Sequence, residues 1–249
     1  MSIKSILLLC SIVTIQCSLP PARPNAENKP ILSGTFYNHT FIAWMKDSIP
    51  GTMPYYCLSL TFSSSDSVEI KNGIETFSLP CVISGDTGMI PGAYQTPGGI
   101  KDIAFIIIND STLSLLDTAI TYHSKGSEFI KNGSSFETLV NDATISGDYQ
   151  NIKAKSTNSR VQFTSDGHVI GLSPYTSYEV CYAGDCLDEP LIPARVITLN
   201  APDEATDFVY TFDQQKGLLS LFSLEAAKPD IQGERKVKDQ FISLKRIKL

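Results

Sequence analysis

An internal repeat is the feature that most constrains the fold of this chain of 249 residues. The motif Leu-Ser-Gly-Thr-Phe-Tyr-Asn at residues 32–38 matches Ile-Ser-Gly-Asp-Tyr-Gln-Asn at residues 145–151. Repetition of this kind indicates a duplicated structural unit, so we expect two similar units in tandem. Two further matches follow in the same order, namely residues 102–106 with 207–211 and residues 113–116 with 219–222.

Short alternating segments in both copies predict β-strands. Residues 56–62 alternate, and residues 74–82 are expected to return after a hairpin turn at Asn72-Gly73. No long segment has a helical period, although residues 135–142 between the copies suit one or two helical turns. The Gly- and Pro-rich residues 91–99 are interpreted as a long connection. The other expected strands are residues 67–71, 103–108 (a buried run), 112–117, 160–164, 168–172, 177–182, 195–199, 208–213, 218–224 and 241–247.

The order of motifs in the second copy carries a family resemblance. Gly34 and Gly147 each stand two positions before an aromatic residue. The second copy continues with Val-Gln-Phe-Thr-Ser-Asp-Gly at residues 161–167, then Leu-Ser-Leu at residues 219–221 and a final strand. This order resembles the lipocalin-like lipoprotein domains of Bacteroidetes, and it covers residues 144–249 better than the first copy.

The resemblance implies a fold class and a domain division. The expected fold is all-β, with two tandem antiparallel lipocalin-like β-barrels or half-barrels at residues 31–134 and 143–249. With 42% hydrophobic residues, the chain has enough apolar material for such cores. The resemblance implies no known ligand.

The N-terminus predicts export and an anchor. Residues 6–15 are almost wholly apolar, which suits a signal peptide at residues 1–16 and is too short for a membrane span of about 20 residues. Cys17 follows and resembles the lipidation site of bacterial lipoproteins, although Gln16 stands where a small residue is usual. Residues 17–30 would then be the lipidated cysteine and a Pro-rich tether. An ordinary secretory signal is the alternative.

Four cysteines follow the predicted anchor: Cys57, Cys81, Cys181 and Cys186. An even number in an exported chain favours disulfides, and pairing within each copy gives Cys57–Cys81 and Cys181–Cys186. Free thiols are the main alternative. A redox pair lacks the Cys-x-x-Cys spacing, and a metal site lacks a neighbouring histidine.

Catalytic motifs are missing from the sequence. It has no Gly-x-Ser-x-Gly, Ser-x-x-Lys or His-Glu-x-x-His motif, and His39, His123 and His168 are scattered and interpreted as solvated. Acidic pairs such as Asp203-Glu204 lack the spacing of a calcium loop, so we expect no metal and no cofactor. A net charge of -6 argues against non-specific nucleic-acid binding.

These observations predict a non-enzymatic, lipid-anchored protein of the bacterial cell envelope, facing the periplasm from the outer membrane. Its partner would be a small apolar ligand or another envelope protein. The alternatives are a structural or interaction module of an envelope complex, and a hydrolase whose histidine or carboxylates converge only in the fold. A secreted binding protein, glycosylated at Asn38, Asn109 and Asn132, is a further alternative.

Overall fold

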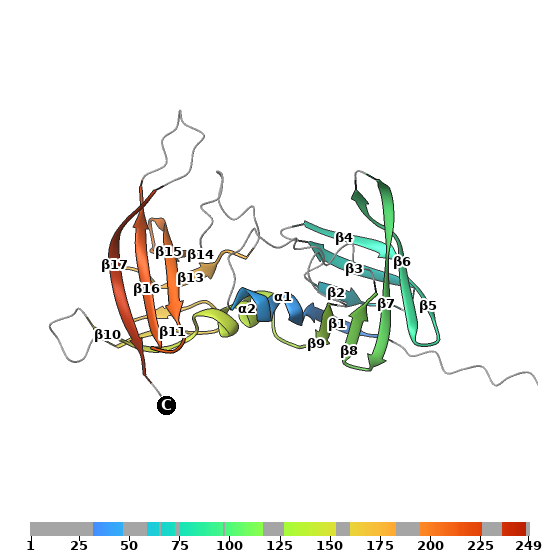
Figure 1. Ribbon diagram of the computed structural model, residues 1–249, viewed down its shortest axis with the longest axis horizontal. Helices are drawn as coiled ribbons and strands as arrows, with labels where there is room; N and C mark the ends of the chain where they lie inside the picture. The colour runs from blue at the N-terminus through green and yellow to red at the C-terminus, as the bar shows by residue number, and fades with distance from the viewer. Residues whose placement is uncertain are drawn as a thin grey trace, which may run out of the picture.

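The computed structural model describes residues 32–46, 59–64, 66–72, 75–96, 98–116, 127–152, 160–182, 195–225 and 236–247. Within these residues the protein is mostly β, with two antiparallel sheets and two short helices (Figure 1). The predicted signal peptide, Cys17 and the tether lie outside the described residues. Among the described residues, none belongs to a helix that is long and apolar enough to cross a membrane.

The first sheet contains nine strands in the order β4-β3-β2-β1-β9-β8-β7-β6-β5. β1 pairs with both β2 and β9, so the first and last strands of this unit are joined. β4 and β5 stand at opposite ends of the order, yet Cys81 alone separates them in the chain. Their bounds are β1 Gly34–Asn38, β2 Ser59–Phe62, β3 Ser67–Asn72, β4 Glu75–Pro80, β5 Val82–Ser84, β6 Thr87–Thr96, β7 Gly99–Asn109, β8 Thr112–Leu115 and β9 Glu128–Lys131.

The second sheet follows the same scheme and is nearly closed into a barrel. Its order is β12-β11-β10-β17-β16-β15-β14-β13, so that its first strand, β10, again pairs with its last, β17. A bridge between His168 and Ser177 joins the two ends of the order. The bounds are β10 Gly147–Asn151, β11 Arg160–Phe163, β12 Val169–Ile170, β13 Ser177–Val180, β14 Arg195–Asn200, β15 Ala205–Asp213, β16 Leu218–Leu224 and β17 Val237–Arg246.

The matched segments of the sequence occupy equivalent places in the two orders. Residues 32–38 include β1 and residues 145–151 include β10, and each of these strands is the first of its unit and pairs with the last. The second match lies on β7 and β15, and the third lies on β8 and β16. The pairing runs β1-β9-β8-β7 in one sheet and β10-β17-β16-β15 in the other, so the sequence matches follow the topology.

Where the first and last strands of each unit pair, a cationic side chain of the last strand lies over an aromatic ring of the first. Lys131 of β9 is the register partner of Phe36 on β1, and its ammonium lies 6.0 Å from the ring centroid. Arg246 of β17 likewise pairs with Tyr149 on β10, at 5.9 Å from its ring. A Cβ on Gly34 would lie 2.9 Å from Lys131 Cε, and a Cβ on Gly147 would lie 2.9 Å from the Arg246 guanidinium; both glycines have positive φ. This explains why the Gly-x-aromatic motif occurs twice.

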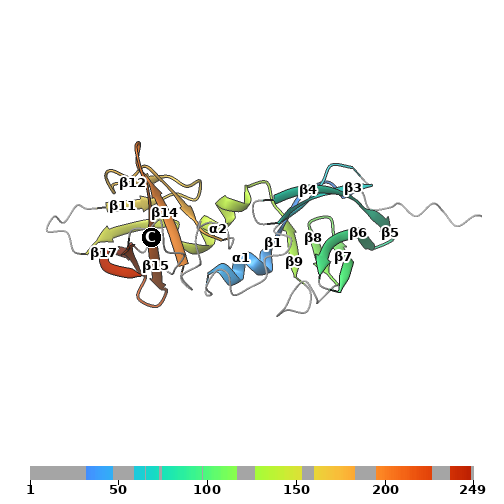
Figure 2. The same ribbon diagram turned by 90° about the horizontal axis from the view of Figure 1, so that it is seen from above.

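Two helices lie between the sheets and pack against each other (Figure 2). α1 (His39–Met45) begins where Asn38 accepts a hydrogen bond from the Phe41 backbone, and α2 (Phe136–Thr144) begins at the cap Ser135. Although α1 follows β1, its buried side chains belong to the core of the second sheet, together with those of α2. The first sheet encloses a separate core built on Phe36, Phe62, Phe105 and Phe129.

Several sequence expectations need correction. Residues 103–108 are not buried on both faces, because β7 alternates and Ile108 points to solvent. Most of residues 91–99 belong to β6 and β7, with a register shift in β6 between Ile90 and Tyr94, and do not form a long loop. Residues 168–172 supply only the two-residue strand β12. The strand β9 and the helix α1 were not expected, whereas α2 confirms the helical turns predicted between the copies.

The predicted disulfide between Cys57 and Cys81 is wrong, because Cys81 carries a free, buried thiol. The side chain turns inward between β4 and β5 and joins the core of the first sheet. Burial there raises the pKa of the thiol to about 11. Cys57 lies outside the described residues. Cys181 is buried and is not a free thiol, but Cys186 lies outside the described residues, so their pairing stays a prediction.

Candidate functional site

A pocket of about 520 Å³ lies where the second sheet fails to close. β12 has only two residues, so its contact with β13 is limited to the bridge at His168 and Ser177 and the backbone hydrogen bonds beside it. α2 lies across the gap, and the pocket opens between α2, the turn before β12, and β13. Ligand pockets have volumes of roughly 300–1,000 Å³, so this pocket is the candidate functional site.

Glu137 forms the α2 wall of the pocket. One of its carboxylate oxygens accepts hydrogen bonds from Lys71 Nζ at 2.6 Å and from the Tyr182 hydroxyl at 2.9 Å. Lys71 comes from β3 of the first sheet, so this contact also ties the first sheet to α2. Burial alone would raise the pKa of Glu137, but the hydrogen bonds from Lys71 and Tyr182 outweigh it and lower the pKa to about 2.

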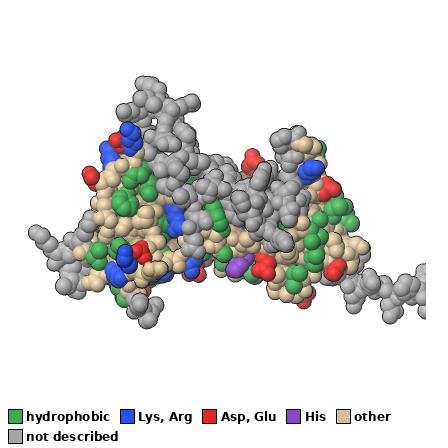
Figure 3. All heavy atoms as spheres, in the orientation of Figure 1, with side chains coloured by type: hydrophobic (Ala, Val, Ile, Leu, Met, Phe, Trp, Pro, Cys, Tyr) green, Lys and Arg blue, Asp and Glu red, His purple; other side chains and the backbone are tan. Residues whose placement is uncertain are grey.

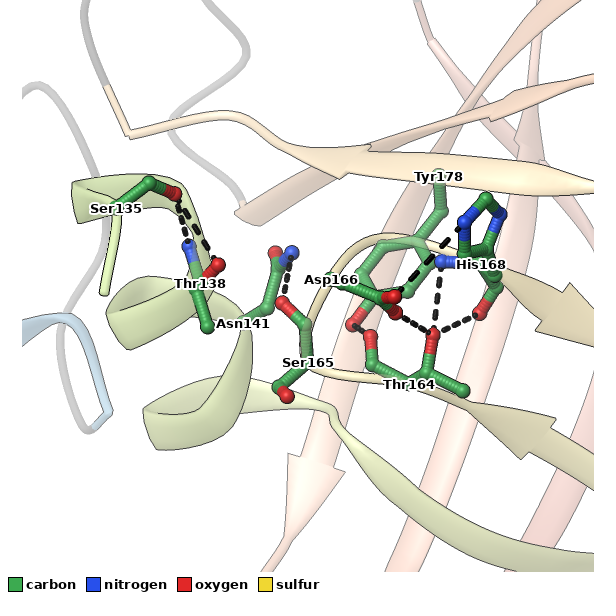
Figure 4. A network of polar contacts seen from close by, with 8 residues as sticks. All are labelled: Ser135, Thr138, Asn141, Thr164, Ser165, Asp166, His168 and Tyr178. Carbon is green, nitrogen blue, oxygen red and sulfur yellow. Dashed lines mark hydrogen bonds and ion pairs between the residues drawn. The ribbon is translucent and has the colours of Figure 1, made fainter. Parts of the chain in front are cut away.

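The turn between β11 and β12 forms the opposite wall, and a network of hydrogen bonds fixes its shape (Figure 4). The Thr164 hydroxyl donates to the Asp166 carboxylate and accepts from the His168 backbone at 3.0 Å. The amide of Asn141 on α2 donates to the Ser165 carbonyl at 3.1 Å. The turn is therefore held from its own strand and from α2.

Tyr178 of β13 braces the same turn from inside the sheet. Its side chain is buried, and its hydroxyl donates to the Thr164 carbonyl at 2.8 Å (Figure 4). Its ring packs edge-on against Phe163. Burial raises the pKa of Tyr178 well above its ordinary value, so the phenol stays protonated. The ring thus presents a neutral aromatic surface to the pocket.

Asp166, His168 and Ser177 line the pocket together, which allows a test of the hydrolase alternative. His168 Nε2 lies 3.9 Å from Asp166 Oδ2, and both side chains are about two-thirds exposed. In the part of the chain that the structure describes, no hydrogen bond joins the Ser177 hydroxyl to the imidazole. Ser177 and His168 are therefore neighbours that do not make the nucleophile–base hydrogen bond of a catalytic triad in this structure.

The structure places few of the residues singled out from the sequence at this site. His168 lines it, but His39 is exposed on α1, and His123 lies outside the described residues. No group of three or more His, Cys, Asp or Glu side chains converges on a metal position within the described ranges. The Asn38 side chain caps α1 and is buried, so this sequon is not open to glycosylation.

The central residue of the site, Glu137, gave no signal in the sequence. It lies in the short segment expected to form helical turns between the copies, and its two partners are distant in the chain. Lys71 looked like an ordinary strand residue at a hairpin. Only the packing of α2 against both sheets brings these side chains together.

No family model, curated protein or solved structure matches this chain.

Proposed function

We propose that this chain is a non-enzymatic binding protein of the bacterial cell envelope, anchored through a lipidated Cys17, whose second lipocalin-like unit holds a small ligand. The observation that supports the proposal is the pocket of about 520 Å³ between α2 and β13. Its walls are fixed by hydrogen bonds from Asn141 and Tyr178, so the cavity is formed before any ligand enters.

Native mass spectrometry of residues 18–249, purified from a bacterial periplasm without detergent, tests this proposal. We expect a bound small molecule at one copy per chain, released by solvent extraction. A Ser177→Trp variant places an indole in the pocket and should lose the passenger. Ser78→Trp, on an exposed position of β4, is the matched control and should keep it. An empty wild-type chain that stays empty with added ligand mixtures would contradict the proposal.

A second candidate, an interaction module of an envelope complex, is favoured by the outer face of the first sheet. Val82, Met89 and Ala104 are direct cross-strand partners on β5, β6 and β7, and Leu116 follows β8 beside them. Val82, Met89 and Leu116 are each about half exposed, and Figure 3 shows hydrophobic side chains gathered over this sheet. An apolar row across three neighbouring strands and the residue after β8 is typical of a surface that meets a partner.

Site-specific crosslinking separates the two candidates. A photoreactive side chain at Met89 should trap one defined envelope protein if the apolar row is an interface. The same side chain at Asp239, an exposed position at the other sheet, serves as the control. Equal crosslinking patterns from both positions would count against the interaction module.

A further inference from the structure

The walls of the pocket are rich in negative charge. Glu137, Asp166 and Glu179 all line it, whereas no Lys or Arg stands in the described lining. The carboxylate of Glu137 and that of Asp166 are both held ionised at neutral pH by their hydrogen bonds. A recess bounded by ionised carboxylates attracts a cation and repels a carboxylate or a phosphate.

The remaining walls are apolar and aromatic. Val140 and Val180 contribute aliphatic surface, and Tyr178 and Tyr182 contribute rings. Tyr182 is itself held by an edge-on contact with Phe136, whose ring centroid lies 5.1 Å away. Aliphatic surface buries a hydrocarbon tail, and aromatic faces attract an organic cation. The lining therefore suits a molecule that carries both features.

An ammonium group already sits on Glu137. Lys71 places its Nζ 2.6 Å from the carboxylate of Glu137, which itself lines the pocket. The Lys71 side chain is 29% exposed, so solvent could take over its ammonium group if a competing amine displaced it. The contact shows that the carboxylate is aimed and hydrogen-bonded for a primary amine.

We propose that the pocket binds a small organic cation with an apolar body, such as a primary alkylamine, and that Glu137 holds its ammonium group in place of Lys71. The inference rests on the binding function proposed above for the same pocket. It adds a coupling, because a bound amine releases the contact that ties β3 of the first sheet to α2. Binding thus weakens one link between the two sheets.

Calorimetry with three probes of equal chain length tests the chemistry of the ligand. Octylamine, 1-octanol and octanoate share the tail and differ in the charge of the head group. We expect octylamine to bind at least about tenfold more tightly than 1-octanol, because a charge-assisted hydrogen bond is stronger than a neutral one. Octanoate should not bind measurably, and added salt should weaken octylamine alone.

Three variants locate the ammonium. Glu137→Gln keeps the shape of the side chain and should reduce octylamine affinity about tenfold while leaving 1-octanol unchanged. Glu128→Gln, on β9 and outside the pocket, makes the same change of charge and should have no effect. Lys71→Met removes the competitor and should raise octylamine affinity. The emission of Trp44, the single tryptophan, reports that each variant is folded, because Trp44 packs against the second core.

The outcomes separate this inference from the function on which it rests. Equal binding of octylamine and 1-octanol, or an unchanged octylamine affinity in Glu137→Gln, overturns the cation site and leaves a ligand pocket. Failure of all three probes to bind, together with an empty chain in native mass spectrometry, overturns the binding function itself.

Discussion

The two sheets share one pairing order but enclose different interiors. The first is filled by phenylalanine and aliphatic side chains, with the thiol of Cys81 among them. The second contains three buried tyrosines, and α1 and α2 complete its core. The two end strands of each sheet are connected in different ways. In the first sheet, the chain runs directly from β4 to β5 through Cys81, and in the second a single bridge joins His168 to Ser177.

The incomplete closure of the second sheet accounts for the pocket described there. In the first sheet, β4 and β5 are consecutive in the chain, so one continuous segment supplies both end strands of the sheet. In the second sheet, the corresponding edge strands are a two-residue β12 and a four-residue β13, and the gap between them is covered by α2. One duplicated topology therefore yields a packed unit and a unit with an open side.

The packed interior of the first sheet should be destabilised most by a substitution that adds volume to it. A side chain at Gly88 would place its Cβ 2.0 Å from the Phe105 ring, which is wholly buried. We expect Gly88→Ala to lower the free energy of unfolding by about 3 kcal/mol, because no neighbour can move aside. Gly133→Ala meets no atom within 4 Å and is the control. Urea unfolding checks both variants, and similar midpoints would contradict the packing described.

The cations at the two strand junctions should differ in importance. Arg246 lies over two rings, Tyr149 and Phe212, and also donates to the Ser146 carbonyl, whereas Lys131 lies over Phe36 alone. We expect Arg246→Ala to cost about 2 kcal/mol of unfolding free energy and Lys131→Ala about 1 kcal/mol or less. Thermal unfolding of the two variants measures the difference. A larger loss for Lys131→Ala than for Arg246→Ala would contradict this ranking of the two junctions.

The buried tyrosines distinguish the second interior and should not respond alike to loss of the hydroxyl. Tyr149 donates to the Ile145 carbonyl and Tyr178 to the Thr164 carbonyl, so Phe at either position should cost about 1 kcal/mol. Among the described residues, the buried Tyr210 hydroxyl has no hydrogen-bond partner, and the nearby Thr144 hydroxyl donates to the backbone instead. Tyr210→Phe should therefore be neutral or stabilising by up to about 1 kcal/mol. Denaturant unfolding that ranks Tyr210→Phe as the most damaging would refute this reading.

Many of the strands and the internal repeat could be predicted from the sequence, because alternation and turn residues act over short distances. The strand 218–224 is found as β16, and β3 pairs with β4 as a hairpin near Asn72-Gly73 requires, with Asn72 and Glu75 as register partners. The turn itself includes residues 73–74, which lie outside the described residues. The Gly-x-aromatic repeat was visible too. The reason for the repeated glycine could not be predicted, because the cationic side chain that fills the space beside each glycine comes from the last strand of the unit.

The candidate site was not predictable in the same way. The Cys57–Cys81 pairing followed from counting cysteines within a copy, but the inward turn at Cys81 depends on how β4 and β5 bend around the core. Likewise, α1 is a short helix whose apolar side chains are buried by packing into the core of the second sheet, which is distant in the chain. Glu137 is notable only in the folded chain, where it accepts hydrogen bonds from Lys71 of β3 and from Tyr182, which follows β13. Features set by contacts between distant segments leave no local signature.

The smallest expected effect concerns the link between the sheets. Since Lys71 and Tyr182 hold the pKa of Glu137 at about 2, below its value in the unfolded chain, the carboxylate stabilises the folded state above about pH 4.5. That contribution is lost as the pH falls from about 4.5 toward 2. A double-mutant cycle with Lys71→Met and Glu137→Gln should give a coupling of about 0.5 kcal/mol at pH 6.5, because both side chains are partly exposed. The coupling should shrink on acidification, and one that grows would mean that another group holds Glu137.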